Sequence, residues 1–184
     1  SVTSHTIDST FDKARDVYAI DIDDDGDIDV LGASYGDDDI NWWENDGSES
    51  FTQHAIDTSF TNANSVYATD VDHDGDIDVL GMARGDDDVT WWENDGSESF
   101  TKHLIEGDFD HAYSVYATDI DLDGDVDVLG SARRANTVTW WENDGSESFT
   151  ENPIQTNFDG AETVYAADID GDGDIDILAA SNED

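Results

Sequence analysis

Short apolar stretches alternate with polar turn residues along the chain, and no stretch has the 3.6-residue periodicity of an amphipathic helix. In the middle of the chain, four stretches are rich in β-branched and aromatic residues and are typical of strands, at 65–71, 76–83, 88–93 and 99–105. Asn94-Asp95-Gly96, between the third and the fourth, is a strong signal for a β-hairpin. The pattern therefore predicts an all-β fold.

A unit of 49 residues recurs along the chain. One acidic pattern opens four times at that spacing, at Asp21, Asp70, Asp119 and Asp168. Eleven consecutive residues, beginning Trp-Trp-Glu-Asn-Asp-Gly, occur identically at 42–52, 91–101 and 140–150. Four antiparallel strands in a repeat of about 40–50 residues are typical of a β-propeller blade. We predict that residues 1–184 form a single β-propeller domain of four four-stranded repeats, with the first strand of each innermost.

The fourth repeat is incomplete. Four units of 49 residues require 196 residues and the chain has 184, so the twelve residues equivalent to 87–98 have no counterpart. We expect residues 1–8 to supply the outer strand of the fourth blade, whereas its third strand has no source in the sequence. The blade is then completed either within one chain or between chains, and two chains joined head to tail would give eight blades.

Charge and composition narrow the possible functions. The chain has 6 Lys and Arg against 48 Asp and Glu, a formal net charge of −42, which argues against electrostatic binding to nucleic acid or to an anionic membrane surface. No apolar stretch is long enough to span a membrane. The absence of cysteine excludes disulfides, zinc–thiolate sites and thiol catalysis. Hydrophobic residues make up 36% of the chain, which argues against disorder.

Each repeat contains the pattern Asp-x-Asp-x-Asp-Gly-Asp-x-Asp, first at 21–29. Five carboxylates within nine residues repel one another unless a cation neutralises them. Oxygen ligands at alternate positions, with glycine at the sixth for a sharp turn, are typical of a calcium loop. We expect the first, third, fifth and ninth aspartates to bind through side chains and the seventh through its backbone carbonyl. The candidate ligands are Asp21, Asp23, Asp25, Asp27, Asp29, Asp70, Asp72, Asp74, Asp76, Asp78, Asp119, Asp121, Asp123, Asp125, Asp127, Asp168, Asp170, Asp172, Asp174 and Asp176.

These loops predict about four calcium ions per chain. An EF-hand is excluded because its twelfth position requires glutamate, and that position is here Gly32, Gly81, Gly130 or Ala179. Magnesium is less suited, because it demands octahedral geometry and retains its waters. The alternative is a set of acidic, solvated turns on a salt-adapted surface.

The DxDxDGxxD loops of all four repeats resemble those of the FG-GAP and VCBS repeat families, and integrin α-subunit propellers carry similar loops. The Phe-Gly and Gly-Ala-Pro landmarks are absent, so the resemblance is closer to the VCBS-like bacterial branch. It implies a calcium-dependent propeller, extracellular or at the cell surface, that serves adhesion, ligand binding or a polysaccharide-active enzyme as an accessory domain. It does not imply catalysis.

The repeats differ most in two loops. Because loops alternate between the two ends of an antiparallel blade, the acidic loops and the Asn-Asp-Gly hairpins share one end and the variable loops share the other. Neutral variation of exposed loops is one interpretation. The other is a recognition face, since five of the six basic residues lie there. The candidate ligand-binding residues are Lys13, Arg15, Arg84, His111, Tyr113, Arg133 and Arg134.

Two further recurring features have simpler interpretations. The tryptophan pairs, such as Trp42-Trp43, are potential sugar-stacking platforms, but adjacent blades cover both faces of a blade, so we expect both rings in the core. Histidines recur at the repeat spacing and are interpreted as tolerated strand positions, at His5, His54 and His103.

The sequence thus predicts a non-catalytic, calcium-stabilised secreted module for adhesion or for recognition of a glycan or a protein, without a nucleic-acid partner. A structural repeat protein that forms a homo-oligomer through the incomplete blade is one alternative, and an accessory domain of a polysaccharide-active enzyme is another. An enzymatic propeller is least favoured, because no nucleophile with a base and an orienting partner is evident.

Overall fold

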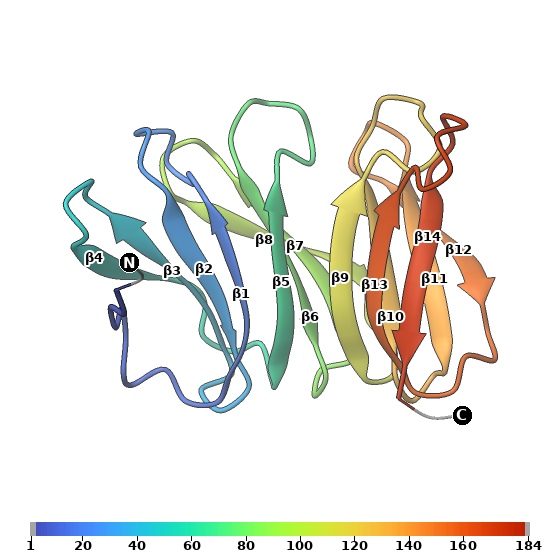
Figure 1. Cartoon of the computed structure of the whole chain (residues 1–184), viewed down its shortest axis with the longest axis horizontal. Coiled ribbons are helices and arrows are strands. Elements are labelled where there is room, and N and C mark those ends of the chain that lie inside the picture. Colours follow the sequence, from blue (N-terminus) through green and yellow to red (C-terminus); the bar gives the residue numbers. More distant parts are fainter. Residues whose placement is uncertain (1–2, 183–184) are drawn as a thin grey trace.

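The computed structural model describes residues 3–182, which form fourteen strands and no helix (Figure 1). This part of the chain accordingly has no helix that could cross a membrane. The strands are grouped in four antiparallel sheets, which are the blades of the fold. Blades 1, 2 and 3 have four strands each, in chain order, and blade 4 has two.

The strands follow one another at the repeat spacing. Blade 1 comprises β1 (Ala14–Ile20), β2 (Asp29–Ser34), β3 (Asp39–Asn45) and β4 (Phe51–Asp57). Blade 2 comprises β5 (Ala63–Thr69), β6 (Asp78–Ala83), β7 (Asp88–Asn94) and β8 (Phe100–Glu106). Blade 3 comprises β9 (Ala112–Thr118), β10 (Asp127–Ala132), β11 (Thr137–Asn143) and β12 (Phe149–Gln155). Blade 4 comprises β13 (Ala161–Ala167) and β14 (Asp176–Ser181).

The four strands expected in the second repeat are confirmed, and their ends differ from the expected ones by no more than two residues. β5 begins at Ala63, two residues early, because its pairing with β6 continues past an irregularity between Ala63 and Ser65. It ends at Thr69, and the Val71 amide donates to the Asp78 carboxylate (2.9 Å) rather than to a neighbouring strand. The all-β architecture of repeated four-stranded blades is as predicted.

The blades pack face to face in an open arc, and their first strands lie side by side along it (Figure 1). This arrangement is that of a β-propeller that is open on one side. A row of tyrosines follows the first strands, with neighbouring ring centroids 4.7–5.0 Å apart, at Tyr18, Tyr67, Tyr116 and Tyr165. The first strands therefore make the closest approach between blades, as expected of the innermost position.

An apolar core fills each space between successive blades. Leu31 and Trp42 of blade 1 form one buried cluster with Val66 and Trp92 of blade 2. The two tryptophans of a pair consequently face opposite ways, the first toward the next blade and the second toward the preceding one. This confirms that the tryptophan pairs belong to the core and are not sugar-stacking platforms.

The predicted closing strand is not formed within the chain. No strand occurs over residues 3–8, and β14 pairs with β13 alone; Ser1 and Val2 lie outside the described residues. The N-terminal segment instead lies against blade 1, where Ile7, Phe11 and Trp43 line one recess. The reason is the arc itself, which leaves blade 1 and blade 4 on opposite sides of the molecule (Figure 1).

In the three complete blades, a glycine in the second strand lets a tryptophan of the third strand pack closely against it. A methyl group at Gly81 would lie 2.8 Å from the Trp92 ring and 3.2 Å from Phe60. The fourth repeat has Ala179 at this position, and no described strand pairs with β14 on that side. Glycine thus occupies this position where a tryptophan packs against it, and alanine occupies it where no tryptophan does.

We predict that Gly81→Ala destabilises the fold by about 1–3 kcal/mol, because the added methyl group overpacks a rigid ring. Ala179→Gly, at the equivalent exposed position, should cost no more than about 1 kcal/mol of backbone entropy. Urea unfolding followed by tryptophan fluorescence measures both. Equal losses would contradict the assigned packing.

Candidate functional site

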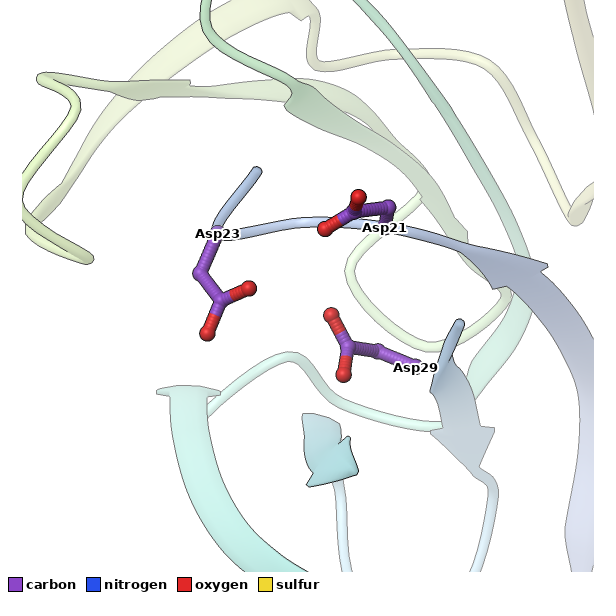
Figure 2. A group of neighbouring side chains, drawn as sticks. All are labelled: Asp21, Asp23 and Asp29. Carbon is purple, nitrogen blue, oxygen red and sulfur yellow. The ribbon is translucent and has the colours of Figure 1, made fainter. Parts of the chain in front are cut away.

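Three of the five aspartates in each acidic loop come together. Between β1 and β2, the carboxylates of Asp21, Asp23 and Asp29 converge on a common space (Figure 2), with one oxygen of each within 4.8 Å of the others. The other repeats form the same group, at Asp70, Asp72 and Asp78, at Asp119, Asp121 and Asp127, and at Asp168, Asp170 and Asp176. The first, third and ninth positions therefore form a candidate cation site in every repeat.

The loop is held in shape by its own carboxylates. Asp21 Oδ2 accepts a hydrogen bond from the Gly26 amide (3.0 Å), and Asp23 Oδ1 accepts one from the Asp25 amide (3.2 Å). Gly26 has a φ of +97°, a conformation that favours glycine. The chain thus turns sharply at the sixth position, as the sequence indicates, and the first and third carboxylates face the same space.

The fifth and seventh aspartates lie outside this group. Asp25 Oδ1 accepts a hydrogen bond from the Asp27 amide (2.8 Å), and the Asp27 carboxylate lies against Gly47 of the neighbouring hairpin. Asp74 and Asp123 accept the equivalent bonds in the next two loops. Ligation by the fifth side chain and by the seventh backbone carbonyl stays a prediction.

The ninth aspartate also joins the loop to the rest of its blade. Asp78 is fully buried, and its two oxygens accept hydrogen bonds from the amides of Val71 (2.9 Å) and Asn94 (2.8 Å). Burial raises the pKa of Asp78 to about 7 and that of the equivalent Asp127 to about 6. Ionising these carboxylates beside two others is therefore costly unless a cation is bound.

The donor set fits a hard divalent cation. Carboxylate oxygens are the ligands that calcium and magnesium prefer. One oxygen of the second group, Asp70 Oδ1, is buried without a hydrogen-bond partner, as expected of an atom available to a cation. The fourth group differs because all three of its aspartates are exposed, and among the described residues no further blade covers that side of blade 4.

The sequence interpretation missed the asparagine that opens each hairpin. Asn94 donates its backbone amide to Asp78 and its side-chain amide to the Ile77 carbonyl (3.1 Å), so it fastens the acidic loop to the end of the third strand. Asn45 and Asn143 make the equivalent pairs of bonds. In the sequence, this asparagine always lies 16 residues after the ninth aspartate, and that constant spacing was the signal that could have indicated the contact.

The recurring histidines have a more specific role than a tolerated strand position. His54 stacks on Trp42, with ring centroids 4.6 Å apart, and its Nε2 lies 2.8 Å from Glu44. The same pair recurs in blade 2 as His103 and Glu93, also at 2.8 Å. These pairs fasten the fourth strand to the third and take no part in the cation groups.

The residues expected to bind a ligand gather at the opposite end of the blades. Tyr35 lies 4.9 Å from the Arg15 guanidinium and 5.5 Å from that of Arg84. Arg84 also lies 5.3 Å from the Tyr113 ring. Loops of blades 1, 2 and 3 thus meet in one surface. We call it the basic face and define it by Lys13, Arg15, Tyr35, Arg84, His111, Tyr113, Arg133 and Arg134.

A recess of about 410 Å³ opens within the basic face. It is lined by Arg84, His111, Arg133, Arg134 and Asn136. Arg84 contacts His111 Nε2, and burial, followed by the charges of Arg84 and Arg134, lowers the pKa of His111. No carboxylate is among the lining residues, although Arg133 pairs with Glu162 beside the recess (3.7 Å). The recess is therefore suited to an anionic or hydroxyl-rich group through Arg84 and Arg134.

Comparison with known proteins agrees with the repeat assignment. The profile of the FG-GAP-like repeat matches three overlapping segments, which together span most of the chain, at 21–81, 70–130 and 119–179. No curated protein matches the sequence.

A similar solved structure is that of a lectin of Agrocybe aegerita, described by its specific recognition of non-reducing terminal N-acetylglucosamine. The two chains align with a TM-score of 0.60 and 19% sequence identity, over 89% of this chain and 46% of the lectin. The chain thus spans about half the length of that lectin, and the likeness supports the fold alone.

The structural role of the ninth aspartate is testable without metal. In a buffer with EDTA, Asp78→Ala should cost about 2 kcal/mol or more, because two buried amides lose their acceptor. Asp72→Ala removes a candidate ligand of the same group. Within residues 3–182 this carboxylate accepts only from the Asp74 amide, so its loss should change the free energy of unfolding by less than about 1 kcal/mol. Urea denaturation compares them, and equal losses would refute the distinction.

Proposed function

The chain belongs to the FG-GAP-like repeat family, and from this premise we propose that it is a non-catalytic, calcium-stabilised module that recognises a glycan or a protein through its basic face. The observation that carries the proposal is the division of the molecule into two ends. One end holds four equivalent aspartate groups, and the other gathers basic and aromatic side chains from three blades. Rigid scaffolds commonly carry their binding residues on such divergent loops.

Calcium is the cation we assign to the aspartate groups. Its 6–8 oxygen ligands and flexible geometry suit three converging carboxylates supplemented by backbone carbonyls or water. When bound, it would neutralise the crowded carboxylates and fix the loop between the first two strands of each blade. We place the module outside the cell or at its surface, where calcium modules typically have dissociation constants of about 10⁻⁴–10⁻³ M.

The basic face favours a ligand with carboxylate or sulfate groups. Arginine forms paired hydrogen bonds with such groups, and Arg84 and Arg134 line the same recess. Tyr35 and Tyr113 add ring surfaces for contact with a sugar or an apolar side chain. The lectin of similar fold recognises N-acetylglucosamine according to its description, which makes a glycan the first ligand class to test.

Removing calcium should lower the stability of the fold. At about tenfold excess over the dissociation constant, each site adds about 1.4 kcal/mol, and four sites add about 6 kcal/mol. Calorimetry at low salt should therefore show a melting temperature many degrees lower in EDTA than in millimolar calcium. The same melting temperature in both would contradict a stabilising role for calcium.

The aspartate groups should also account for the number of ions bound. Asp72→Asn should reduce the calcium stoichiometry by one, because it removes a ligand from the second group. Asp95→Asn, in the neighbouring hairpin of the same blade, removes an equal charge and should leave the stoichiometry unchanged. Isothermal titration calorimetry distinguishes the two, and an equal effect would indicate diffuse counterion binding.

Ligand binding should depend on the basic face. A glycan array in millimolar calcium, spanning neutral and acidic glycans, identifies a ligand for the unmodified chain. Arg134→Ser should weaken that binding about tenfold or more. Lys102→Ser, at the basic residue outside the face, should leave it unchanged. Arg134→Ser should not shift the melting temperature, whereas Lys102→Ser should lower it, because the Asp57 carboxylate loses its ion-pair partner (2.9 Å). Binding that survives Arg134→Ser and Arg84→Ser would contradict the face assignment.

A further inference from the structure

The two ends of the arc expose apolar surface that is buried everywhere else. Val17 of blade 1 is 66% exposed, whereas its equivalents are 3–6% exposed, at Val66, Val115 and Val164. Leu178 of blade 4 is 42% exposed, whereas its equivalents are fully buried, at Leu31, Leu80 and Leu129. We call these surfaces the N-side face, with Val17 and Ile28, and the C-side face, with Tyr165, Ile169 and Leu178.

The three internal interfaces show what covers each of these faces. In every one, the N-side of a blade packs against the C-side of the blade before it. Val66 of blade 2 shares a buried cluster with Ile22 and Leu31 of blade 1, and Val164 of blade 4 shares one with Leu129 of blade 3. The partner that matches an open N-side face is therefore the C-side face of another blade of this type.

We propose that the N-side face of one copy of this chain binds the C-side face of a second copy, head to tail. The contact would place Val17 and Ile28 of one copy against Ile169 and Leu178 of the other. Over the first two strands of each blade it would reproduce the interface that the chain already forms three times. The proposal does not rest on the basic face, which contributes no residue to it. Ile28 and Ile169 belong to the first and fourth acidic loops, so the association is tested in calcium.

Hydrogen bonds between the first strands of successive blades can also extend across the proposed contact. The Val66 amide donates to the Asp16 carboxylate (3.1 Å), and the Val115 amide donates to the Ser65 hydroxyl (3.2 Å). Blade 4 carries Thr163 at this position, so its hydroxyl would replace Asp16 Oδ1 (3.0 Å) as the acceptor of the Val17 amide of the other copy. An oxygen-bearing side chain is thus present in all four repeats, at Asp16, Ser65, Ser114 and Thr163.

The row of tyrosines also extends through the contact. Tyr165 packs against Tyr116 on one side, at 4.7 Å between ring centroids, and is 51% exposed on the other. In the head-to-tail arrangement its open side meets Tyr18 of the second copy. The row of tyrosines then continues from one copy into the other.

Two copies are sufficient to close the arc. Each provides three complete blades and part of a fourth, so two copies give six complete and two partial blades, and the total of eight lies within the range of about 4–8 found in propellers. A heterologous contact that closes by rotation gives a ring in which both seams are the same. Residues 3–8 of one copy then lie beside blade 4 of the other, because the equivalent segment, β4, is the outer strand of the blade before β5.

The mass in solution tests the association. Light scattering of the full chain at about 100 µM, in calcium and moderate salt to limit charge repulsion, should give twice the monomer mass of 20.2 kDa. A monomer under these conditions would overturn the proposal and leave the faces to another occupant. A polydisperse fibre would overturn ring closure.

Substitutions on the N-side and C-side faces test whether both faces take part in the association. Val17→Asp and Leu178→Asp each place a charge in both seams, so each variant alone should be monomeric, with a dissociation constant raised at least about 100-fold. Leu104→Asp is the matched control, because Leu104 is 59% exposed on β8, away from both faces, and it should remain dimeric. Circular dichroism should show native strands in all three variants.

Mixing the two variants separates head-to-tail contact from any symmetrical one. A Val17→Asp chain keeps an intact C-side face, and a Leu178→Asp chain keeps an intact N-side face, so an equimolar mixture should form a 1:1 complex through one native seam. Sedimentation of the mixture against each variant alone measures this. A mixture that stays monomeric, or a single variant that dimerises like the unmodified chain, would overturn the proposal.

Discussion

Face-to-face packing of blades is the interaction on which the rest of the structure depends. A four-stranded sheet with tryptophans on both faces, such as Trp91 and Trp92 of β7, buries them against the blades on either side. That packing supplies the apolar core of a chain whose net charge is −42, and it buries the ninth aspartate of each loop in the first three blades. The cation groups and the basic face are positioned by the same stack, because both lie on loops at the ends of packed strands.

Much of this architecture could be predicted from the sequence because the information is local and is repeated. The spacing of 49 residues fixes the blade, and the alternation around Trp91 and the turn at Asn94 fix its strands to within two residues. The aspartate pattern likewise identified the three carboxylates that each loop brings together, whereas the fifth aspartate, also expected as a side-chain ligand, lies outside the group. Steric and electrostatic constraints that act within nine residues leave few alternative arrangements for such a loop.

The remainder depends on contacts between distant residues, which one sequence does not specify. The path of residues 3–8 is decided by whether another blade is within reach, and the arc places that blade on the opposite side of the molecule. The hydrogen bonds from Asn94 to Asp78 and Ile77 join the end of the third strand to the acidic loop before the second strand, and predicting each strand separately does not reveal them. The gathering of Arg15, Tyr35 and Arg84 likewise required the relative placement of blades 1 and 2.

The three internal interfaces are nearly identical, so the molecule is a one-dimensional array in which each blade packs only against its neighbours. In such an array local free energies of opening fall toward the ends, so the two-stranded blade 4 frays before the middle of the stack. An array joined into a circle has no end from which fraying can begin. If two copies close as proposed, the cooperativity of unfolding becomes a property of the whole ring, which no single blade possesses.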